Sequence, residues 1–312
     1  RFLREAARHK FNITLAARSL HTSQPGISKA IIELEGELGV PILARQGKRI
    51  LGVTPPGQQV LDAAERIMKE VDDLKKMARD YAGAPSGTLR VATTHTQARY
   101  VLPTVVQQFA RKFPQVRLKL LQADPPHIAS MLANGQADVG VATESLAEAA
   151  ALVSVPIYEW QHVALVPPGH PLAKLQKTPG RLTLKDLGRH PIVTYEAHFS
   201  GRSRIDAAFA AAGIEPSIVL EAIDADVIKT YVATGMGVGI VAGVAVDPRS
   251  EPMIVLPCGH LFGSNVTRLA VKRDAYLRGF VYAFIELLAP GWDKLRLEQA
   301  FAAPRPPAEG HR

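Results

Sequence analysis

The hydrophobic pattern of this 312-residue chain changes its period near residue 88. Before that point, apolar residues recur every three to four positions, which is the repeat of α-helices. From Thr88 onward, apolar runs typical of strands, among them residues 116–122, 163–166 and 192–195, alternate with helical runs, which predicts a mainly parallel sheet covered by helices. Two patterns in a chain of this length predict separate domains: an all-α N-terminal part and a larger α/β part.

The N-terminal part has the spacing of a helix-turn-helix. Residues 14–20 and 23–38 are predicted to be helices separated by two residues, with Leu15, Ala16 and Leu20 facing a small core. Ser23 is a good N-cap because its hydroxyl can accept a hydrogen bond from a free backbone amide, and Pro25 falls in the first turn, where no donor is lost. The apolar residues of the second helix are Ile27, Ile31, Leu34 and Leu38. The polar residues left on another face, which could enter a groove of DNA, are Gln24, Ser28 and Lys29.

Positive charge is concentrated at the N-terminal end. The chain has a formal charge of +8, and its first 50 residues contain nine Lys and Arg against four Asp and Glu, which is +5 of the total. A basic surface attracts polyanions such as nucleic acid. The expected surface for such a partner is therefore N-terminal.

The composition also bears on the compartment. Cys258 is the single cysteine, which leaves no disulfide framework and no cysteine cluster for zinc and fits a reducing compartment. No apolar stretch approaches the roughly 18 residues of a membrane span, and residues 1–20 lack the order of a secretory signal. We expect a cytoplasmic protein without membrane contact. The chain starts on an amphipathic helix without Met, so further residues are expected to precede Arg1.

Residues 56–81 have the pattern of a long helix with a narrow apolar seam. Its members, spaced alternately by four and three, are Val60, Ala64, Ile67, Val71, Leu74 and Ala78. A second copy of the chain can bury such a seam more readily than the chain itself, which predicts a dimerising linker helix. Packing of the seam on the N-terminal domain is the alternative.

The α/β part is expected to form two lobes. The first occupies approximately residues 88–158 and the second approximately 159–265, and residues 266–290 are expected to return to the first lobe. The two chain crossings would then form a hinge with a cleft between the lobes. The expected domains are residues 1–55, the linker helix over 56–81, a two-lobed domain over 82–290 and a tail over 291–312.

The run Ser23-Gln24-Pro25-Gly26-Ile27-Ser28-Lys29, with Thr54-Pro55-Pro56-Gly57 downstream, closely resembles the DNA-binding domain of LysR-type transcription regulators. The resemblance implies a winged helix-turn-helix whose recognition helix enters the major groove of promoter DNA. It also implies a dimerising linker helix, assembly into homotetramers and a two-lobed effector domain resembling periplasmic binding proteins. The DNA contacts that it implies are Ser23, Gln24, Pro25, Ser28 and Lys29 in the helix and Arg45, Gln46, Lys48 and Arg49 in the wing.

Residues 93–100, 199–203 and 224–232 further resemble the CysB/Cbl subgroup of that family, which regulates sulfur assimilation, including cysteine biosynthesis. In that subgroup, hydroxyl and amide side chains between the lobes hold sulfate or an acetylserine-type inducer. Sulfonate or sulfate-starvation genes are the alternative regulon, and RNA polymerase is a further partner that the resemblance suggests. The effector residues implied here are Thr94, His95, Thr96, Gln97, Thr143 and Ser200, the last in place of an expected threonine.

The residues favour an anion site at this place independently of the resemblance. Thr94, Thr96 and Gln97 follow a predicted strand and precede a helix, where free backbone amides and the helix dipole favour an anion. Thr143 ends a second strand, and ligands of α/β proteins bind beyond the carboxyl ends of the strands. The alternative is that Thr94 or Thr96 only caps the following helix.

No catalytic residue, metal site or cofactor is predicted. The glycines at 235, 237 and 239 follow a helix and lead into a strand, the reverse of a phosphate-binding loop. The ten histidines include no pair at ligand spacing, and no serine or cysteine lies in a nucleophile-elbow sequence. Two rival interpretations are a solute-binding protein, opposed by residues 1–80, and an enzyme, which lacks a catalytic set.

Overall fold

The computed structural model describes residues 1–47, 49–81, 85–147, 149–178, 180–197, 199, 201–247 and 249–302. The chain divides into two compact units, Arg1–Ala82 and Gly83–Arg312. The first is helical with a small hairpin and the second contains a mixed sheet in two lobes, which confirms the predicted fold class. None of the helices in the described part of the chain is long and apolar enough to cross a membrane.

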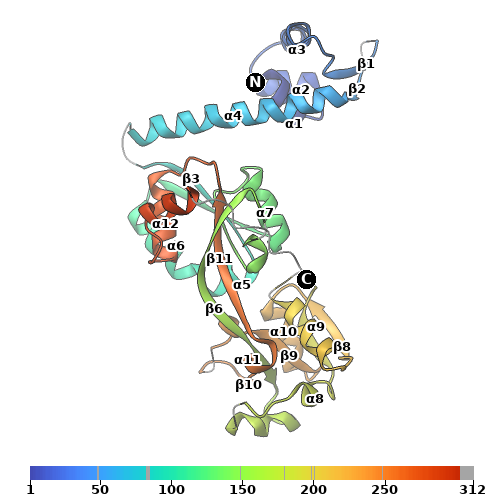
Figure 1. The fold of residues 1–312 in the computed structure, drawn as a ribbon, viewed down its shortest axis with the longest axis vertical. Helices are drawn as coiled ribbons and strands as arrows, with labels where there is room; N and C mark the ends of the chain where they lie inside the picture. Colours follow the sequence, from blue (N-terminus) through green and yellow to red (C-terminus); the bar gives the residue numbers. More distant parts are fainter. Residues whose placement is uncertain are drawn as a thin grey trace. The chain divides into compact units, whose positions relative to one another are not determined.

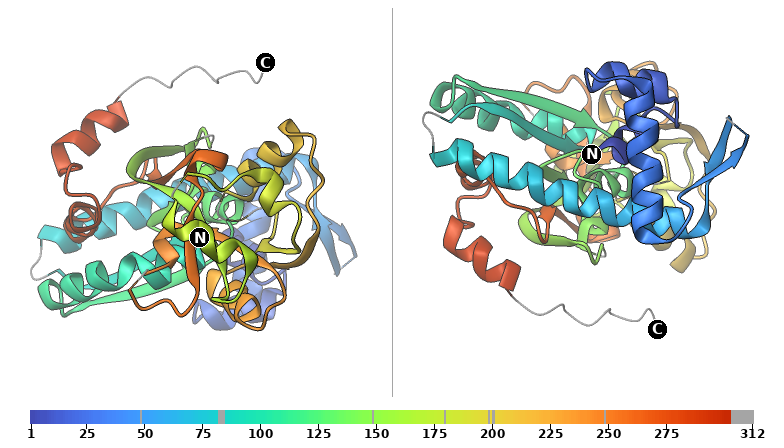
Figure 2. Two further views of the ribbon diagram at one scale, coloured as in Figure 1. Left: turned by 90° about the horizontal axis from the view of Figure 1, so that it is seen from below. Right: turned by 90° about the horizontal axis from the view of Figure 1, so that it is seen from above.

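The first unit is a small helical domain with a two-stranded wing. Its elements are α1 (Phe2–Arg8), α2 (Ile13–Ser19), α3 (Gln24–Leu38), β1 (Leu43–Gln46), β2 (Arg49–Val53) and α4 (Pro55–Tyr81). Ile27 and Ile31 of α3 are buried in one core with Ile13 and Ala17 of α2. Ala16 is also buried in this core and Leu20 packs against it, as expected. The expectation for Leu15 is wrong, because its side chain is 44% exposed. The antiparallel β1–β2 hairpin projects beyond the helices of this unit (Figure 2).

The long helix α4 is packed at its start and uncovered farther along. Val60 and Ala64 pack against the core of the first unit. Ile67 and Leu74 are each 63% exposed, and Val71 is half-buried. The alternative interpretation, in which the seam packs on the N-terminal domain, therefore holds for the first two seam residues. The exposed residues farther along α4 remain available to another partner.

Lobe I of the second unit is built on parallel strands. The strand order is β4-β3-β5-β11-β6, with β3 parallel to both of its neighbours. Leu89, Phe109 and Phe284 lie in its main core. The elements of this lobe are β3 (Gly87–Thr93), α5 (His95–Tyr100), α6 (Leu102–Lys112), β4 (Val116–Gln122), α7 (Pro125–Ala133), β5 (Val139–Ala142), the 3-10 turn η1 (Glu144–Ala147), α12 (Gly279–Leu288) and α13 (Lys294–Ala302).

Lobe II repeats the arrangement, with β7 parallel to β8 and β9 and with β10 and β9 antiparallel to β6. Cys258 is fully buried in its core, and burial raises the pKa of the thiol far above its ordinary range, which fits an inert structural role. The elements of this lobe are η2 (Pro171–Lys177), α8 (Leu184–Leu187), β7 (Ile192–Tyr195), α9 (Arg202–Ala211), β8 (Ile218–Ala222), α10 (Ala225–Ala233), β9 (Val238–Ala242), η3 (Gly243–Ala245), β10 (Ile254–Pro257) and α11 (Gly259–Phe262).

Two long strands connect the lobes. β6 (Leu152–Val166) and β11 (Ser264–Lys272) run antiparallel, side by side, from one lobe to the other (Figure 1). At its far end β11 also pairs with β5 of lobe I. Because opposed residues of an antiparallel pair point to the same face, Tyr158 and Thr267 share one face of this ribbon with the next opposed pair on that face, Trp160 and Asn265.

The C-terminal segment differs from the expected tail. Residues 294–302 form the helix α13, in which Leu297 is completely buried. The Trp292 indole Nε1–H donates to the carbonyl of Pro156 at 3.1 Å, which holds the start of the segment on the β6 ribbon. The expectation of a tail is therefore wrong for residues 291–302, and residues 303–312 lie outside the described part of the chain.

Candidate effector site and nucleic-acid interface

The face of α3 turned away from the core carries the residues predicted to contact bases. Ser23 is the N-cap of the helix, as predicted, and its hydroxyl accepts a backbone N–H of the first turn at 3.2 Å. The Gln24 amide Nε2 donates to the Ser28 hydroxyl at 3.1 Å. Pro25 is exposed, and exposed Lys29 lies 3.7 Å from a carboxylate one turn along. The Ser23 hydroxyl is thus already used by the fold, while the other four side chains lie on or near the surface.

Glu35 joins the recognition helix to the wing. Its Oε1 accepts the backbone N–H groups of Ile42 at 2.8 Å and Leu43 at 2.9 Å, and its Oε2 lies 3.0 Å from Arg45 Nη2. Arg45, predicted to contact phosphate, is therefore held by an internal carboxylate. Lys48 and the side chain of Arg49 lie outside the described residues.

Three of the predicted effector residues lie together at the carboxyl end of β3. Thr94 is the N-cap of α5, and Thr96 and Gln97 belong to its first turn; all three are buried. The Thr94 side chain makes no capping hydrogen bond, so the capping alternative does not describe it. Among the described residues, neither its hydroxyl nor that of Thr96 has a hydrogen-bond partner.

Gln97 is bound by both crossover strands. Its amide Nε2 donates to the Thr267 hydroxyl at 3.3 Å, and its Oε1 accepts the hydroxyl of Tyr158 at 2.5 Å. Since burial raises the pKa of Tyr158 above its ordinary value, the phenol remains a proton donor. The hydrogen bonds to Thr267 and Tyr158 fix α5 to the two crossover strands. One amide N–H of Gln97 is left for a ligand.

Asp226 of α10 links lobe II to α5 of lobe I. Its Oδ1 accepts the Tyr100 hydroxyl at 2.5 Å, and its Oδ2 lies 3.2 Å from Arg99 Nε and 3.7 Å from His95 Nε2. Within lobe II, Lys229 Nζ lies 3.6 Å from the same carboxylate. We call the four residues Asp226, Tyr100, Arg99 and Lys229 the interlobe tie.

The charges of the interlobe tie favour an ionised carboxylate. Partial burial raises the pKa of Asp226, but the hydrogen bond from Tyr100 and the cations of Lys229 and Arg99 lower it more, so the net shift is downward. Burial and the hydrogen bond to Asp226 raise the pKa of Tyr100. At neutral pH the tie therefore joins an anionic carboxylate to a neutral phenol and two cations.

The remaining predicted effector residues lie around this region. Thr143 directly follows β5 and is half-buried. His95 Nε2 is buried and has no hydrogen-bond partner in the described structure, although it lies within ion-pair range of Asp226. Ser200 lies outside the described residues. His95, Asp224 and Asp226 have atoms close enough to hold a metal ion, but the cations already beside Asp226 would oppose one.

Comparison with known proteins assigns both units. Residues 1–58 match the model of the bacterial regulatory helix-turn-helix proteins of the lysR family, and residues 82–293 match the LysR substrate binding domain. The chain belongs to the LysR family. It is a DNA-binding transcription regulator, and the family consists of regulators rather than enzymes.

Two curated relatives of this LysR regulator cover nearly its whole length. It is 52% identical to the HTH-type transcriptional regulator CysB of Burkholderia cenocepacia over 96% of this chain and 95% of that one. It is 48% identical to SsuR of the same organism over 93% of each chain. Among solved structures, the cofactor-binding domain of the Cbl transcriptional regulator matches with a TM-score of 0.65 and 44% identity over 70% of this chain and 95% of that one.

Several contacts of this LysR regulator escaped the sequence analysis. Tyr158, Thr267 and the tie partners Tyr100 and Asp226 received no role, because they meet Gln97 or one another across 61 to 170 residues of chain. The ribbon face that carries two of them also has buried polar atoms without a partner in the described structure. These are Trp160 Nε1 and Asn265 Oδ1.

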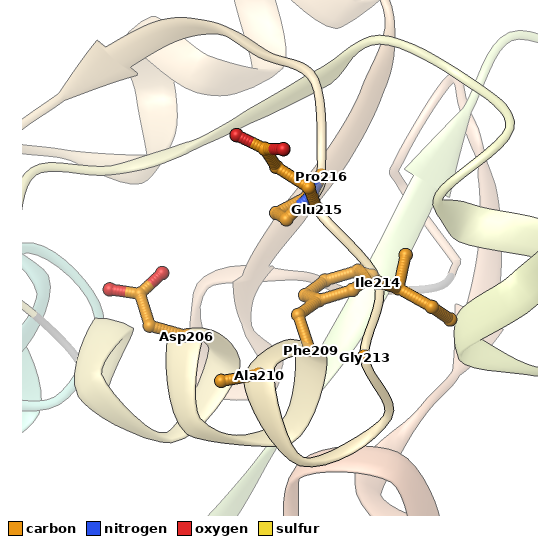
Figure 3. A pocket seen from close by; sticks show the side chains of 7 residues that line it. All are labelled: Asp206, Phe209, Ala210, Gly213, Ile214, Glu215 and Pro216. Atoms are coloured by element: carbon orange, nitrogen blue, oxygen red, sulfur yellow. The ribbon is translucent and has the colours of Figure 1, made fainter.

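One pocket in the described part of this LysR regulator lies away from these residues. It has a volume of about 360 Å³ and lies between α9 and the loop that follows it (Figure 3). Phe209, Ile214 and Pro216 give it apolar walls, and the carboxylates of Asp206 and Glu215 border it. Two carboxylates repel an anion, so this pocket is a poor receptor for sulfate or a carboxylate-bearing metabolite.

Proposed function

We propose that this LysR regulator controls genes of sulfur assimilation and cysteine biosynthesis in response to a small effector bound between its lobes. The effector is a sulfur oxyanion or an acetylserine-type compound. The observation that carries the proposal is the pair of buried threonines, Thr94 and Thr96, whose hydroxyls lack a partner at the carboxyl end of β3. The likeness to CysB along nearly the whole chain supports the same regulon.

Hydroxyl groups suit such an effector for a physical reason. A hydrogen bond to a charged acceptor contributes about 1.5–3 kcal/mol, and a bound oxyanion or carboxylate could accept one from each of the two threonine hydroxyls. Thr143 and Ser200 complete the proposed hydroxyl set, with Gln97 and His95 as further donors. Because α5 has only six residues, we expect its dipole to contribute less to anion binding than the threonine hydroxyls do.

Calorimetric titration of the intact chain tests the effector class. The ligands are sulfate, thiosulfate, adenylyl sulfate, O-acetylserine and N-acetylserine, with succinate as an anion outside these classes. We expect saturable binding of at least one sulfur oxyanion or acetylserine compound and none of succinate. Binding of none of the five compounds would contradict the proposed effector class.

The proposed DNA interface divides its work between α3 and the wing. Gln24, Pro25, Ser28 and Lys29 would reach base edges in the major groove. Arg45, Lys48 and Arg49 would contact phosphates, as would Ser23 through the helix start that it caps. Phosphate contacts set affinity and register, and base contacts specify the sequence. The +5 charge of the first 50 residues supports this placement.

The assembly that we propose is a dimer through α4, which pairs further into a tetramer. Exposed Ile67 and Leu74 are seven residues apart, and a second α4 would cover them in a coiled-coil seam. Effector binding would shift the angle between lobes, and the paired linker helices would convey that shift to the recognition helices. RNA polymerase is the proposed partner of the assembly on the promoter.

A second candidate regulon is favoured by the 48% identity to SsuR and by the likeness to the Cbl domain. In that case the chain would regulate sulfonate-utilisation or sulfate-starvation genes. Selection of genomic fragments bound by the chain in its own organism separates the two regulons. Fragments upstream of cysteine-biosynthesis genes favour the first, and fragments upstream of sulfonate genes favour the second.

A further inference from the structure

The recognition helix carries an apolar side chain in the middle of its polar face. Ile32 is 53% exposed, although Ile27 and Ile31 of the same helix are fully buried. A single exposed apolar residue needs no explanation by itself. The position of Ile32 on the helix does, because that face is the one proposed to enter DNA.

The helical repeat places Ile32 among the proposed base contacts. With about 100° between successive residues, Ile32 lies about 40° from Ser28 and about 60° from Lys29 around the axis of α3, with one of them on each side. It lies one helical turn beyond Ser28 on the same stripe. An inserted helix would therefore present Ile32 to the base pair next to those that Ser28 and Lys29 reach.

The surroundings of Ile32 permit close approach. Gly36, one turn farther on, has open space where a side chain would stand, and Ser28, one turn before, is small. Isoleucine is restricted to essentially one χ1 rotamer in a helix, so little side-chain freedom is lost on contact. The major groove offers such a side chain one apolar group, the 5-methyl of thymine.

We propose that Ile32 is a specificity-determining residue that contacts a thymine methyl group in each half-site of the operator. The proposal rests on the proposed docking of α3 in the major groove. It predicts a preference for thymine at one position of each half-site and no such contact with cytosine, which lacks the methyl group.

Replacement of thymidine by deoxyuridine tests the contact, because it removes only the 5-methyl group. An operator is first selected from random duplexes with the intact wild-type chain, and each thymidine is then replaced in turn. We expect one position per half-site at which wild-type affinity falls roughly fourfold, which corresponds to one methyl group left unburied. The variant Ile32→Ala should bind the thymidine and deoxyuridine duplexes equally, and Ile32→Val should keep most of the difference.

Leu38→Ala is the matched control, since Leu38 is 48% exposed on the same helix but lies about 120° from Ile32 around the axis. It should keep the wild-type response to deoxyuridine. The proposal is overturned if no replacement of thymidine by deoxyuridine lowers the affinity of the wild type. It is also overturned if Ile32→Ala keeps the wild-type ratio of affinities for the thymidine and deoxyuridine duplexes, whether or not that variant changes self-association. Failure of the proposed DNA docking has a different signature, since no duplex would then be selected over random sequence.

Discussion

Two threonine hydroxyls at the start of α5 carry the effector proposal at the scale of single residues. Val has nearly the shape of Thr but lacks the hydroxyl, so Thr96→Val removes one donor and little volume. We expect effector affinity to fall roughly tenfold or more, the equivalent of one hydrogen bond to a charged group. Thermal stability should not decrease, because the hydroxyl has no partner in the described structure.

Titration calorimetry and a thermal melt measure the two quantities on the same sample. Thr104→Val is the control, since Thr104 is an exposed residue of α6 in the same lobe. It should leave the affinity unchanged. A loss of stability in Thr96→Val, with unchanged effector affinity, would mean that the threonine has a structural role only.

The interlobe tie predicts a dependence on pH at the same scale. The pKa of Asp226 is lowered in the folded chain, so its contribution to stability is complete above the ordinary aspartate pKa and is lost as the pH falls through the lower folded value. Asp226→Asn should therefore cost about 1 kcal/mol at pH 7, a small value because the carboxylate is partly exposed. The difference from wild type should shrink below about pH 4.

Melting temperatures between pH 3 and pH 8 check this prediction. Glu298→Gln serves as the control, because Glu298 lies on α13, outside the tie, and forms an exposed ion pair with Lys294 of its own helix at 3.7 Å. Effector affinity should fall in Asp226→Asn, because without the tie the ligand alone would have to hold α5 near α10. It should not fall in the control. An equal cost of Asp226→Asn at pH 3 and pH 7 would contradict the tie.

At the scale of elements, Glu35 determines how the wing follows the recognition helix. Glu35→Ala should destabilise the chain by about 2 kcal/mol, because two backbone N–H groups would lose a charged acceptor. Glu35→Gln should cost less, since its amide oxygen can still accept them. Both variants release Arg45 from its internal partner, and Glu35→Ala should also weaken DNA binding by misplacing β1.

Thermal melts and duplex binding by fluorescence anisotropy measure these effects. Glu33→Gln is the matched control on the same helix, because Glu33 forms an exposed ion pair with Lys29 at 3.7 Å and contributes about 0–1 kcal/mol. The role of Glu35 would be excluded if Glu35→Ala were as stable as this control.

Most elements could be predicted from sequence, and the failures have physical causes. β4 and β7 occupy the predicted residues 116–122 and 192–195. β7 has the continuous apolar run of a buried strand, whereas β4, which is largely exposed or half-buried, alternates apolar and polar residues over 116–119. β6 was predicted only over 163–166, since Pro156 normally argues against a strand. The structure places Pro156 opposite Arg268, next to a register shift at which β6 carries one extra residue, Ile157, and this irregularity accommodates the proline.

The candidate site was predictable only in part, because several of its contacts join residues that are far apart in the sequence. The threonines around residue 94 were found by resemblance and by their place after a strand. The helix α5 was not itself predicted, because His95–Tyr100 has no apolar repeat. Asp226 could not be connected with Tyr100, because their contact spans 126 residues and depends on how the lobes close.

At the scale of the whole molecule, the proposed regulation depends on pairing of two α4 helices. Ile67→Ser combined with Leu74→Ser should shift the chain toward monomers, because the seam would lose its two most exposed apolar residues. Sedimentation velocity measures the change. Leu295→Ser is the control, as Leu295 is 64% exposed on α13, and it should leave assembly unaltered. An unchanged assembly in the double variant would exclude α4 as the pairing element.

In the proposed mechanism, effector binding in the cleft between the lobes changes how the regulator contacts its promoter DNA. The direct measurement is nuclease footprinting of a selected promoter by the wild type and by Thr96→Val, each with and without the effector identified by calorimetry. We predict that both proteins protect the same site without effector and that effector alters protection only in the wild type. An identical effector-induced change in both proteins, or none in the wild type, would contradict the claim.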